Sequence, residues 1–255
     1  DFALELAEHE LPIVAPLTFG GQSLFEHQGY SFAVYPSRGG RIFEVDNLEQ
    51  LEWMGRFVGR IHALAGQASF THRPSYNTEE SLFQARKVIQ DSKFVPDYLA
   101  SSFFTILDQV IELADSQYQA QHLIRLHGDC HAGNILWTDD GPHFVDLDDC
   151  RMGPAIQDLW MMLSGDRQQQ TLQLDTLLLG YEEFCSFDNR QFALIEALRT
   201  MRLVNYIAWL CKRWQDPAFP HSFPWFNTAK YWEQQILMLK EQMSALQQAP
   251  LSLMP

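Results

Sequence analysis

Two short segments carry an aspartate, an asparagine and a second aspartate at close spacing, and they constrain this chain more than any other feature of its sequence. Residues 126–134 read LHGDCHAGN and residues 144–148 read FVDLD. Asn134 follows Asp129 by five positions, and Asp146 follows Asn134 by twelve. Apolar runs border both segments and an Asp-Asp-Gly-Pro turn lies between them, which predicts strand, loop, strand, turn and strand. We therefore expect Asn134 and Asp146 on the paired arms of one hairpin.

These residue types are the ones that phosphoryl transfer requires. One carboxylate accepts or orients the proton of the attacking hydroxyl, while an amide oxygen and a second carboxylate hold the Mg²⁺ that bridges the nucleotide phosphates. An acidic turn between two short strands is by itself common, so the full set of residues in matching secondary structure carries the interpretation. His127 and His131 are not expected to bind zinc, because Gly128 and Gly133 break the helix that would present both on one face.

The same residues carry a resemblance to a known superfamily. His127, Gly128, Asp129, Asn134 and Asp146 resemble the catalytic core of the aminoglycoside phosphotransferase and choline kinase superfamily, relatives of eukaryotic protein kinases. Longer segments resemble the bacterial stress response kinase A family of serine/threonine protein kinases; they are residues 30–41, 126–137, 144–149, 153–160, 217–220 and 223–225. The resemblance implies that Asp129 is the catalytic base, that Asn134 and Asp146 bind Mg²⁺, with Asp146 also essential to catalysis, and that ATP is the donor.

The resemblance also implies an α+β, protein-kinase-like bilobal fold, with an incomplete N-terminal lobe in this chain and a mainly helical C-terminal lobe. Residues 1–35 are expected to be the remnant of the nucleotide-binding lobe, residues 36–47 the hinge and linker, and residues 48–255 the catalytic lobe. Backbone groups of the hinge would bind adenine, and Tyr35 and Ser37 are predicted to lie at the nucleotide.

Other parts that kinases use to hold nucleotide phosphates are not recognisable. No lysine precedes Lys87, and the glycine pairs at residues 20–21 and 39–40 lack the spacing of a phosphate-binding loop. The chain begins at Asp1 rather than Met, and residues 1–10 are expected to be the end of a helix. We expect the glycine-rich loop, the lysine and its glutamate partner upstream in the gene product. A pseudokinase without those parts is the alternative.

Apolar spacing predicts the remaining elements. Short strands are expected at residues 17–19 and 31–35, and a capping box at residues 46–49 is expected to open a helix that ends at Gly66. Further helices are expected from residue 97 and over residues 156–163, 172–184, 192–214 and 229–247, with a proline-rich loop at residues 217–224. By resemblance, Asp158 is expected on a helix beneath the catalytic loop, where it would accept backbone N–H bonds and hold Asp129 in place. Its alternative role is that of a first-turn acid favoured by the helix dipole.

Charge and cysteine content restrict the partners and the compartment. The net charge is −14, from 18 basic and 32 acidic residues, which disfavours nucleic acid and anionic membrane and favours cationic partners. No apolar run approaches the roughly 18 to 20 residues that cross a bilayer. The cysteines lack paired spacing, which indicates reduced thiols and a cytoplasmic protein; they are Cys130, Cys150, Cys185 and Cys211.

Two observations point to different phosphoryl acceptors. Only eleven residues separate Asp146 from Asp158, too few for a long peptide-binding segment, which favours a small hydroxyl compound such as an aminoglycoside, choline or a homoserine-like metabolite. The family resemblance favours serine and threonine hydroxyls of proteins, in a bacterial stress response, and this is our main prediction. Gly128 stands where eukaryotic protein kinases carry an arginine, so activity is expected not to need a phosphorylated activation loop. A nucleotide-binding scaffold without transfer is a third possibility.

Overall fold

The computed structural model describes residues 1–253, which form two compact units. The first unit consists of residues 1–75, 122–189 and 251–253, and the second of residues 76–121 and 190–250. The chain therefore passes twice from the first unit into the second. The predicted division at residues 35 and 47 does not coincide with these units and stays a prediction.

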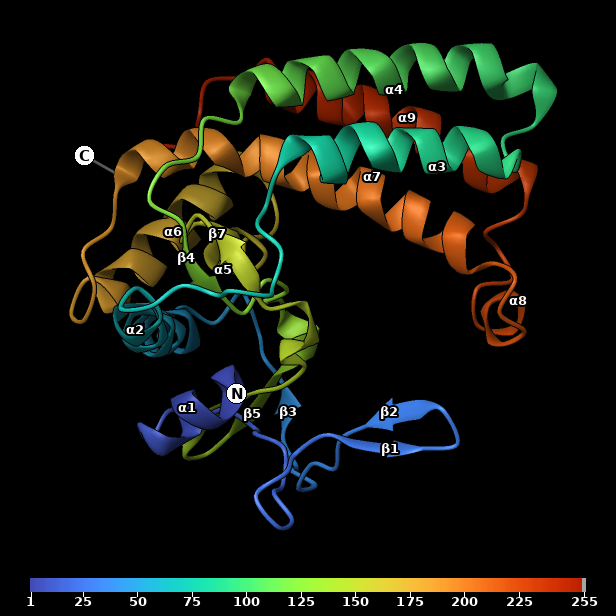
Figure 1. Cartoon of the computed structure of the whole chain (residues 1–255). Coiled ribbons are helices and arrows are strands. Elements are labelled where there is room, and N and C mark those ends of the chain that lie inside the picture. The colour runs from blue at the N-terminus through green and yellow to red at the C-terminus, as the bar shows by residue number, and fades with distance from the viewer. Residues whose placement is uncertain (254–255) are drawn as a thin grey trace. The chain divides into compact units, whose positions relative to one another are not determined.

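The strands of the first unit pair into small antiparallel sheets (Figure 1). They are β1 (Phe25–His27) with β2 (Tyr30–Phe32), β3 (Arg41–Ile42) with β5 (Ile135–Thr138) and β6 (Gly141–Phe144) in the order β3-β5-β6, and β4 (Ile124–Leu126) with β7 (Arg151–Gly153). In the β5–β6 hairpin Ile135 pairs with Phe144 and Thr138 with Gly141, so Asp139 and Asp140 form the connection. The open end of this hairpin lies at residues 134 and 145.

The helices of the first unit are α1 (Phe2–Glu8), α2 (Leu48–Ala65), α5 (Gln157–Trp160) and α6 (Arg167–Tyr181). The N-cap of α2 is Asn47, whose side chain accepts a hydrogen bond from the Gln50 backbone, so the predicted capping box lay one residue too early. Gly66 ends α2 as predicted. Helix α6 begins earlier than expected because Asp166 and Gln169 form a capping box in front of its apolar residues.

Helices α2 and α6 pack with their backbones in contact. A Cβ atom at Gly55 or at Gly180 would overlap a backbone carbonyl oxygen of the opposite helix, that of Leu177 or of Glu52, respectively. A Cβ atom at Gly59 would also overlap the backbone carbonyl oxygen of Tyr181, at 2.5 Å. Only glycine permits this approach at these positions, and it fixes the α2 side chains that follow Gly59 against the end of α6.

The second unit is helical. Its elements are a π-helical turn (Glu79–Gln84), α3 (Ala85–Ser92), α4 (Asp97–Gln117), α7 (Ile195–Arg213), α8 (Ala218–Ser222) and α9 (Ala229–Leu246). A 3₁₀ turn (Asn189–Leu194) leads from the first unit into α7. Helix α4 lies beside α9, and α3 beside α7 (Figure 1). Phe103 of α4 meets Trp232 of α9 edge to face at 5.2 Å, and both side chains are fully buried. Within residues 1–253 there is no helix with the length and apolar character needed to span a membrane.

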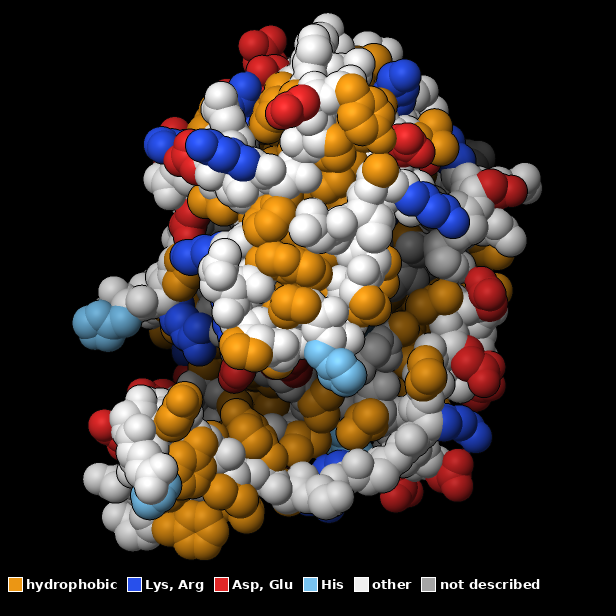
Figure 2. Space-filling view, turned by 90° about the vertical axis from the view of Figure 1, so that its right-hand side faces the viewer, with side chains coloured by type: hydrophobic (Ala, Val, Ile, Leu, Met, Phe, Trp, Pro, Cys, Tyr) orange, Lys and Arg blue, Asp and Glu red, His pale blue; other side chains and the backbone are white. Residues whose placement is uncertain are grey.

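Several strand predictions near the N-terminus were wrong. Residues 17–19 do not form a strand; Phe19 makes an isolated bridge with Gln22, and the Leu17 N–H donates to the Val34 carbonyl. The second predicted strand, residues 31–35, is present only as β2, which ends at Phe32. The β1–β2 hairpin escaped prediction because its aromatic side chains are not alternately buried. Phe25 is half-buried, whereas Tyr30 and Phe32 are exposed. On the face shown in Figure 2, hydrophobic side chains gather in the lower part of the view.

Other boundaries also differ from the predictions. The returning strand of the second hairpin, β6, ends at Phe144, so Asn134 and Asp146 lie just beyond the hairpin's paired arms and not on them as predicted. The predicted loop at residues 217–224 contains the short helix α8, and α3 was not predicted. Helix α4 begins at Asp97 as predicted, and Phe103, Ile106 and Val110 of its predicted apolar face are buried.

Candidate functional site

The loop between β4 and β5 carries Asp129. Gly128 precedes it with a φ of +87°, and a Cβ atom there would overlap the Asp149 carbonyl oxygen. A larger residue cannot occupy that position without moving the loop, so the arginine of eukaryotic protein kinases has no place here. The loop ends in a 3₁₀ turn (Ala132–Asn134) that leads directly into β5.

Asn134 contacts Asp129 directly. The Asn134 side-chain amide nitrogen donates to the Asp129 backbone carbonyl at 3.0 Å and lies 3.4 Å from the Asp129 carboxylate. The amide oxygen of Asn134 accepts no hydrogen bond from residues 1–253, although this side chain is 9% exposed. An amide oxygen that accepts no hydrogen bond from the protein is a suitable ligand for a hard cation.

Asp146 lies next to Asn134 at the open end of the β5–β6 hairpin. The Val145 N–H donates to the Asn134 carbonyl at 3.0 Å, and Asp146 then adopts the left-handed conformation with a φ of 62°. Few residues other than glycine adopt this conformation, and strained backbone of this kind gathers at functional sites. Its carboxylate has no hydrogen bond within residues 1–253. The structure thus brings together the three predicted residues, Asp129, Asn134 and Asp146.

The predicted nucleotide residues are less closely tied to this cluster. Tyr35 is half-exposed, and its hydroxyl pKa is raised by burial and then by the negative charges of Asp148 and Asp146. These charges act on Tyr35 because it faces the same region of the first unit. Ser37 is exposed, and its side chain makes no hydrogen bond within the part of the chain that the structure describes.

Two histidines of the loop that carries Asp129 contact the cluster. Buried His127 reaches the Val145 carbonyl with Nε2 at 2.9 Å, while its Nδ1 accepts from the Asp129 N–H at 3.4 Å. His131 accepts from the Gly133 N–H through Nδ1, and its Nε2 lies 3.4 Å from the Asp129 carboxylate. His131 is therefore a site residue that the sequence reasoning considered only as a zinc ligand.

Asp158 holds the backbone of the loop that carries Asp129, as predicted. Its Oδ2 accepts the His127 N–H at 2.8 Å and its Oδ1 accepts the Gly128 N–H at 2.9 Å. Burial opposes ionisation of the carboxyl, but the hydrogen bonds from His62 and from the Gly128 backbone N–H favour the carboxylate, and the pKa of Asp158 lies below its ordinary range. The carboxylate thus holds the backbone on the N-terminal side of Asp129.

Sequence reasoning missed two further members of this buried network. His62 of α2 reaches Asp158 with Nε2 at 3.2 Å and the Tyr181 hydroxyl of α6 with Nδ1 at 3.0 Å. The signal was present, because His62 follows Leu51, Gly55 and Val58 on the apolar face of α2 and is a polar residue at a core position.

An ion pair between buried Arg125 and half-exposed Glu5 supports the strand that leads into the loop. Arg125 of β4 binds both carboxylate oxygens of Glu5 in α1, at 2.6 and 2.8 Å, and donates to the Ala65 carbonyl at the end of α2. The Phe2 ring covers the guanidinium at 4.7 Å from its centroid. The hydrogen bond from Arg125 holds the pKa of Glu5 below its ordinary range. This arginine, which interrupts an apolar strand, is a structural link between α1, α2 and the strand that leads into the Asp129 loop.

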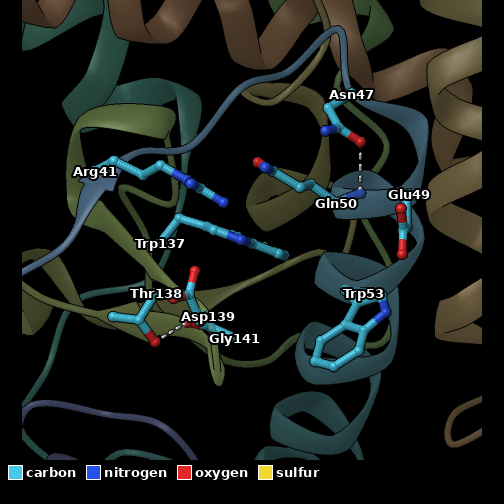
Figure 3. A pocket seen from close by; sticks show the side chains of 9 residues that line it. All are labelled: Arg41, Asn47, Glu49, Gln50, Trp53, Trp137, Thr138, Asp139 and Gly141. Atoms are coloured by element: carbon cyan, nitrogen blue, oxygen red, sulfur yellow. Dashed lines mark hydrogen bonds between the residues drawn. The ribbon is translucent and has the colours of Figure 1, made fainter.

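A cavity of about 260 Å³ lies at the other end of β5, and its lining includes Arg41, Gln50, Trp53 and Trp137 (Figure 3). Arg41 and Trp137 are paired across β3 and β5. Neither Asp129 nor the other two residues of the cluster lines it. Its volume lies below the roughly 300 to 1,000 Å³ that is typical of ligand pockets. It is separate from the site at the hairpin's open end.

Comparisons with known proteins show the family to which the chain belongs. A sequence model of the phosphotransferase enzyme family (APH) matches residues 1–195. Stress response kinase A from Escherichia coli strain K12 is 49% identical over 255 residues, which is 100% of this chain and 77% of that protein. The chain belongs to the stress response kinase A family of phosphotransferases. The serine/threonine protein kinase RdoA of Salmonella typhimurium strain LT2 is 49% identical over the same shares of the two chains.

Solved structures confirm the fold of this stress response kinase A family member. An amicoumacin kinase in complex with AMP-PNP and Ca²⁺ aligns over 99% of this chain and 77% of its own, with a TM-score of 0.70 and 17% identity. The choline kinase LicA from Streptococcus pneumoniae covers 96% of this chain and 79% of its own, with a TM-score of 0.65 and 12% identity. The predicted α+β, protein-kinase-like fold is thereby confirmed, and the chain is a phosphotransferase.

Proposed function

We propose that this phosphotransferase uses ATP and Mg²⁺ and transfers the γ-phosphoryl group to serine and threonine hydroxyls of proteins, in a bacterial stress response. The observation that carries the proposal is the arrangement at the open end of the β5–β6 hairpin. The Asn134 amide oxygen and the Asp146 carboxylate are neighbours without hydrogen-bond partners in residues 1–253, beside the carboxylate of Asp129. Two hard oxygen ligands next to a carboxylate fit a metal-bound nucleotide and an acceptor hydroxyl.

Each residue then has one role. Asp129 accepts the proton of the attacking hydroxyl and orients that hydroxyl for in-line attack. Asn134 and Asp146 hold Mg²⁺, which neutralises charge on the phosphates when it is bound. His131, 3.4 Å from the Asp129 carboxylate, restrains that side chain on its exposed side. Asp158 keeps the loop backbone in place through the two N–H groups that it accepts.

The nucleotide base is proposed to lie over the exposed face of the β3–β5 pair. Ile42 is paired with Leu136 and is 75% exposed, on a strand that lies within the proposed hinge and linker. Gly40 comes so close to Leu136 that a Cβ atom would lie 2.8 Å from that side chain. We place the nucleotide-binding remnant at residues 1–35, the hinge at 36–47, with Tyr35 and Ser37 at the base, and the catalytic lobe at 48–255.

The protein acceptor is supported by family membership at about half identity over the whole chain. The four cysteines are free thiols and the net charge is −14, which fits a cytoplasmic enzyme that acts on basic protein segments rather than on nucleic acid or anionic membrane.

A small hydroxyl acceptor is the second candidate, because a 3₁₀ turn (Leu147–Asp149), β7 and the start of α5 occupy the stretch between Asp146 and Asp158. That stretch leaves no long segment to receive a peptide.

Transfer of label from γ-labelled ATP tests the proposal in the whole gene product with Mg²⁺. The acceptors are a generic basic protein and a panel of amino alcohols and aminoglycosides, and Asp129→Asn is the control. Label on protein serine or threonine, lost in the variant, is the expected result. Label only on a small molecule would replace the protein acceptor by the second candidate. Nucleotide binding without any transfer, unchanged by Asp129→Asn, would favour a scaffold instead.

A further inference from the structure

A continuous chain of buried hydrogen bonds runs from α6 to the catalytic loop. The Tyr181 hydroxyl contacts His62 Nδ1 at 3.0 Å, and His62 Nε2 contacts Asp158 Oδ2 at 3.2 Å. Asp158 in turn accepts the backbone N–H groups of His127 and Gly128, on the N-terminal side of Asp129. We propose that His62 and Tyr181 are positioning residues for phosphoryl transfer, which act on Asp129 through Asp158. This inference rests on the proposed function of Asp129.

The hydrogen bonds have one consistent direction. Both oxygens of Asp158 accept backbone N–H groups, so His62 Nε2 must donate to the carboxylate. His62 Nδ1 is then an acceptor, and the Tyr181 hydroxyl donates to it. The hydroxyl of Tyr181 therefore fixes the tautomer and the ring orientation of His62, in the way that an outer hydrogen bond orients a metal-binding or catalytic histidine.

The helices make this chain of contacts rigid. Gly55, Gly59 and Gly180 bring the α2 and α6 backbones together, and His62 follows Gly59 by about one turn toward the end of α6. The side chain of His62 is fully buried, that of Asp158 is 2% exposed, and Tyr181 is 1% exposed. With solvent excluded, each polar atom of the chain depends on its protein partner, because an unpaired buried group is destabilising.

A purely structural role would predict a different result from a positioning role. If the two residues only fill the core, their removal lowers stability and leaves the turnover of the folded enzyme unchanged. If they position the loop, removing either side chain displaces Asp129. This lowers kcat of the folded enzyme with little effect on KM for ATP, because Asp129 acts in the transition state. The backbone amides of His127 and Gly128 should also exchange their protons faster, since they are the groups that Asp158 holds.

Tyr181→Phe, His62→Gln and His62→Leu are the variants to compare, in the whole gene product. Tyr181→Phe removes one hydroxyl and keeps the ring, while His62→Gln keeps a donor near Asp158. The matched control is Tyr231→Phe, because the Tyr231 hydroxyl is buried and lacks a hydrogen-bond partner in the described residues. Steady-state kinetics, thermal unfolding and amide exchange by NMR are measured for each variant and for the wild type.

We expect Tyr181→Phe to lower kcat by about 3-fold to 10-fold, as the loss of one buried hydrogen bond allows. KM for ATP should stay within about 2-fold, Tyr231→Phe should match the wild type, and His62→Gln should retain more activity than His62→Leu. Wild-type kcat in Tyr181→Phe and in His62→Leu, with only the unfolding temperature lowered, would overturn the inference. So would an equal loss of kcat in Tyr181→Phe and Tyr231→Phe. Absence of transfer in the wild type would instead count against the proposed function.

Discussion

The Asn134 side-chain amide donates to the Asp129 backbone carbonyl at 3.0 Å, and this hydrogen bond couples the orientation of the proposed metal ligand to the position of the proposed base. Because the amide nitrogen is used in this way, its oxygen is the atom left for a cation. The two roles are therefore not independent, and a change at Asn134 acts on both.

Asn134→Ala should weaken the binding of the divalent cation and loosen the loop around Asp129. We expect the Mg²⁺ concentration for half-maximal activity to rise by about 10-fold to 100-fold, as for other losses of a group at a metal site. A Mg²⁺ titration of the initial rate at saturating acceptor measures it. An unchanged Mg²⁺ requirement would remove Asn134 from the metal site.

Gly128→Ala should destabilise the protein because the backbone is left-handed there and the added methyl overlaps the Asp149 carbonyl. The expected loss is about 2 to 4 kcal/mol of unfolding free energy, with activity lost as well. Urea unfolding checks the stability. Gly39→Ala is the matched control for that measurement, because a Cβ at Gly39 meets no atom within 4 Å and should change stability by no more than about 0.5 kcal/mol. Equal stability of the two variants would contradict the steric account.

Asp158 gives the protein a defined sensitivity to acid. Its pKa in the folded state lies below the ordinary value of 3.8, so its carboxylate contributes stability above the pKa of the unfolded state. That contribution is lost as the pH falls through the lowered folded-state pKa, because the unfolded chain binds the proton first. Below about pH 4 we expect unfolding free energy to fall more steeply in the wild type than in Asp158→Asn. If the unfolding free energies of the wild type and Asp158→Asn fell in parallel with pH, Asp158 would not be the source of the acid sensitivity.

Glu5→Gln should reveal the strength of the link between α1 and β4. The substitution removes the negative charge beside the buried guanidinium of Arg125, while the carboxylate of Glu5 is itself 36% exposed. We expect a loss of about 1 to 3 kcal/mol, less than for a wholly buried pair. Lys87→Ala is the comparison, since its ion pair with Asp91 is exposed and should contribute at most about 0.5 kcal/mol. Chemical denaturation of both variants provides the test, and a Glu5→Gln loss as small as that of Lys87→Ala would contradict the link.

The candidate site was largely predictable because its residues lie on one short segment and one hairpin. Gly128, Asn134 and the Asp139–Asp140 turn are local signals, and the strands between them are short and apolar. Asp158 was placed correctly only through the family resemblance. The contacts of His62 could not be read locally, because its partners Asp158 and Tyr181 are separated from it by about a hundred residues in sequence.

The parts of the fold that escaped prediction share a physical cause. In the β1–β2 hairpin Phe25 is only half-buried and Tyr30 and Phe32 are exposed, so burial leaves no period of two to detect. Its Gln28-Gly29 turn, with both residues at positive φ, carries the information instead. Helix α6 was expected to start at residue 172 because polar glutamines fill its first turns, and its capping box at Asp166 sets the true start. The β1–β2 hairpin and the start of α6 are therefore determined by residues at the ends of the elements, and not by the pattern of hydrophobic residues.

The rate of γ-phosphoryl transfer from labelled ATP in the wild type, Asp129→Asn and Asp146→Asn tests the central claim most directly. It is measured over a range of ATP and Mg²⁺ concentrations with the whole gene product. We predict that Asp129→Asn lowers kcat by about 100-fold to 10,000-fold while nucleotide affinity changes little, and that Asp146→Asn nearly abolishes turnover at every Mg²⁺ concentration. Wild-type turnover in either variant would contradict the assignment of this cluster as the phosphoryl-transfer centre.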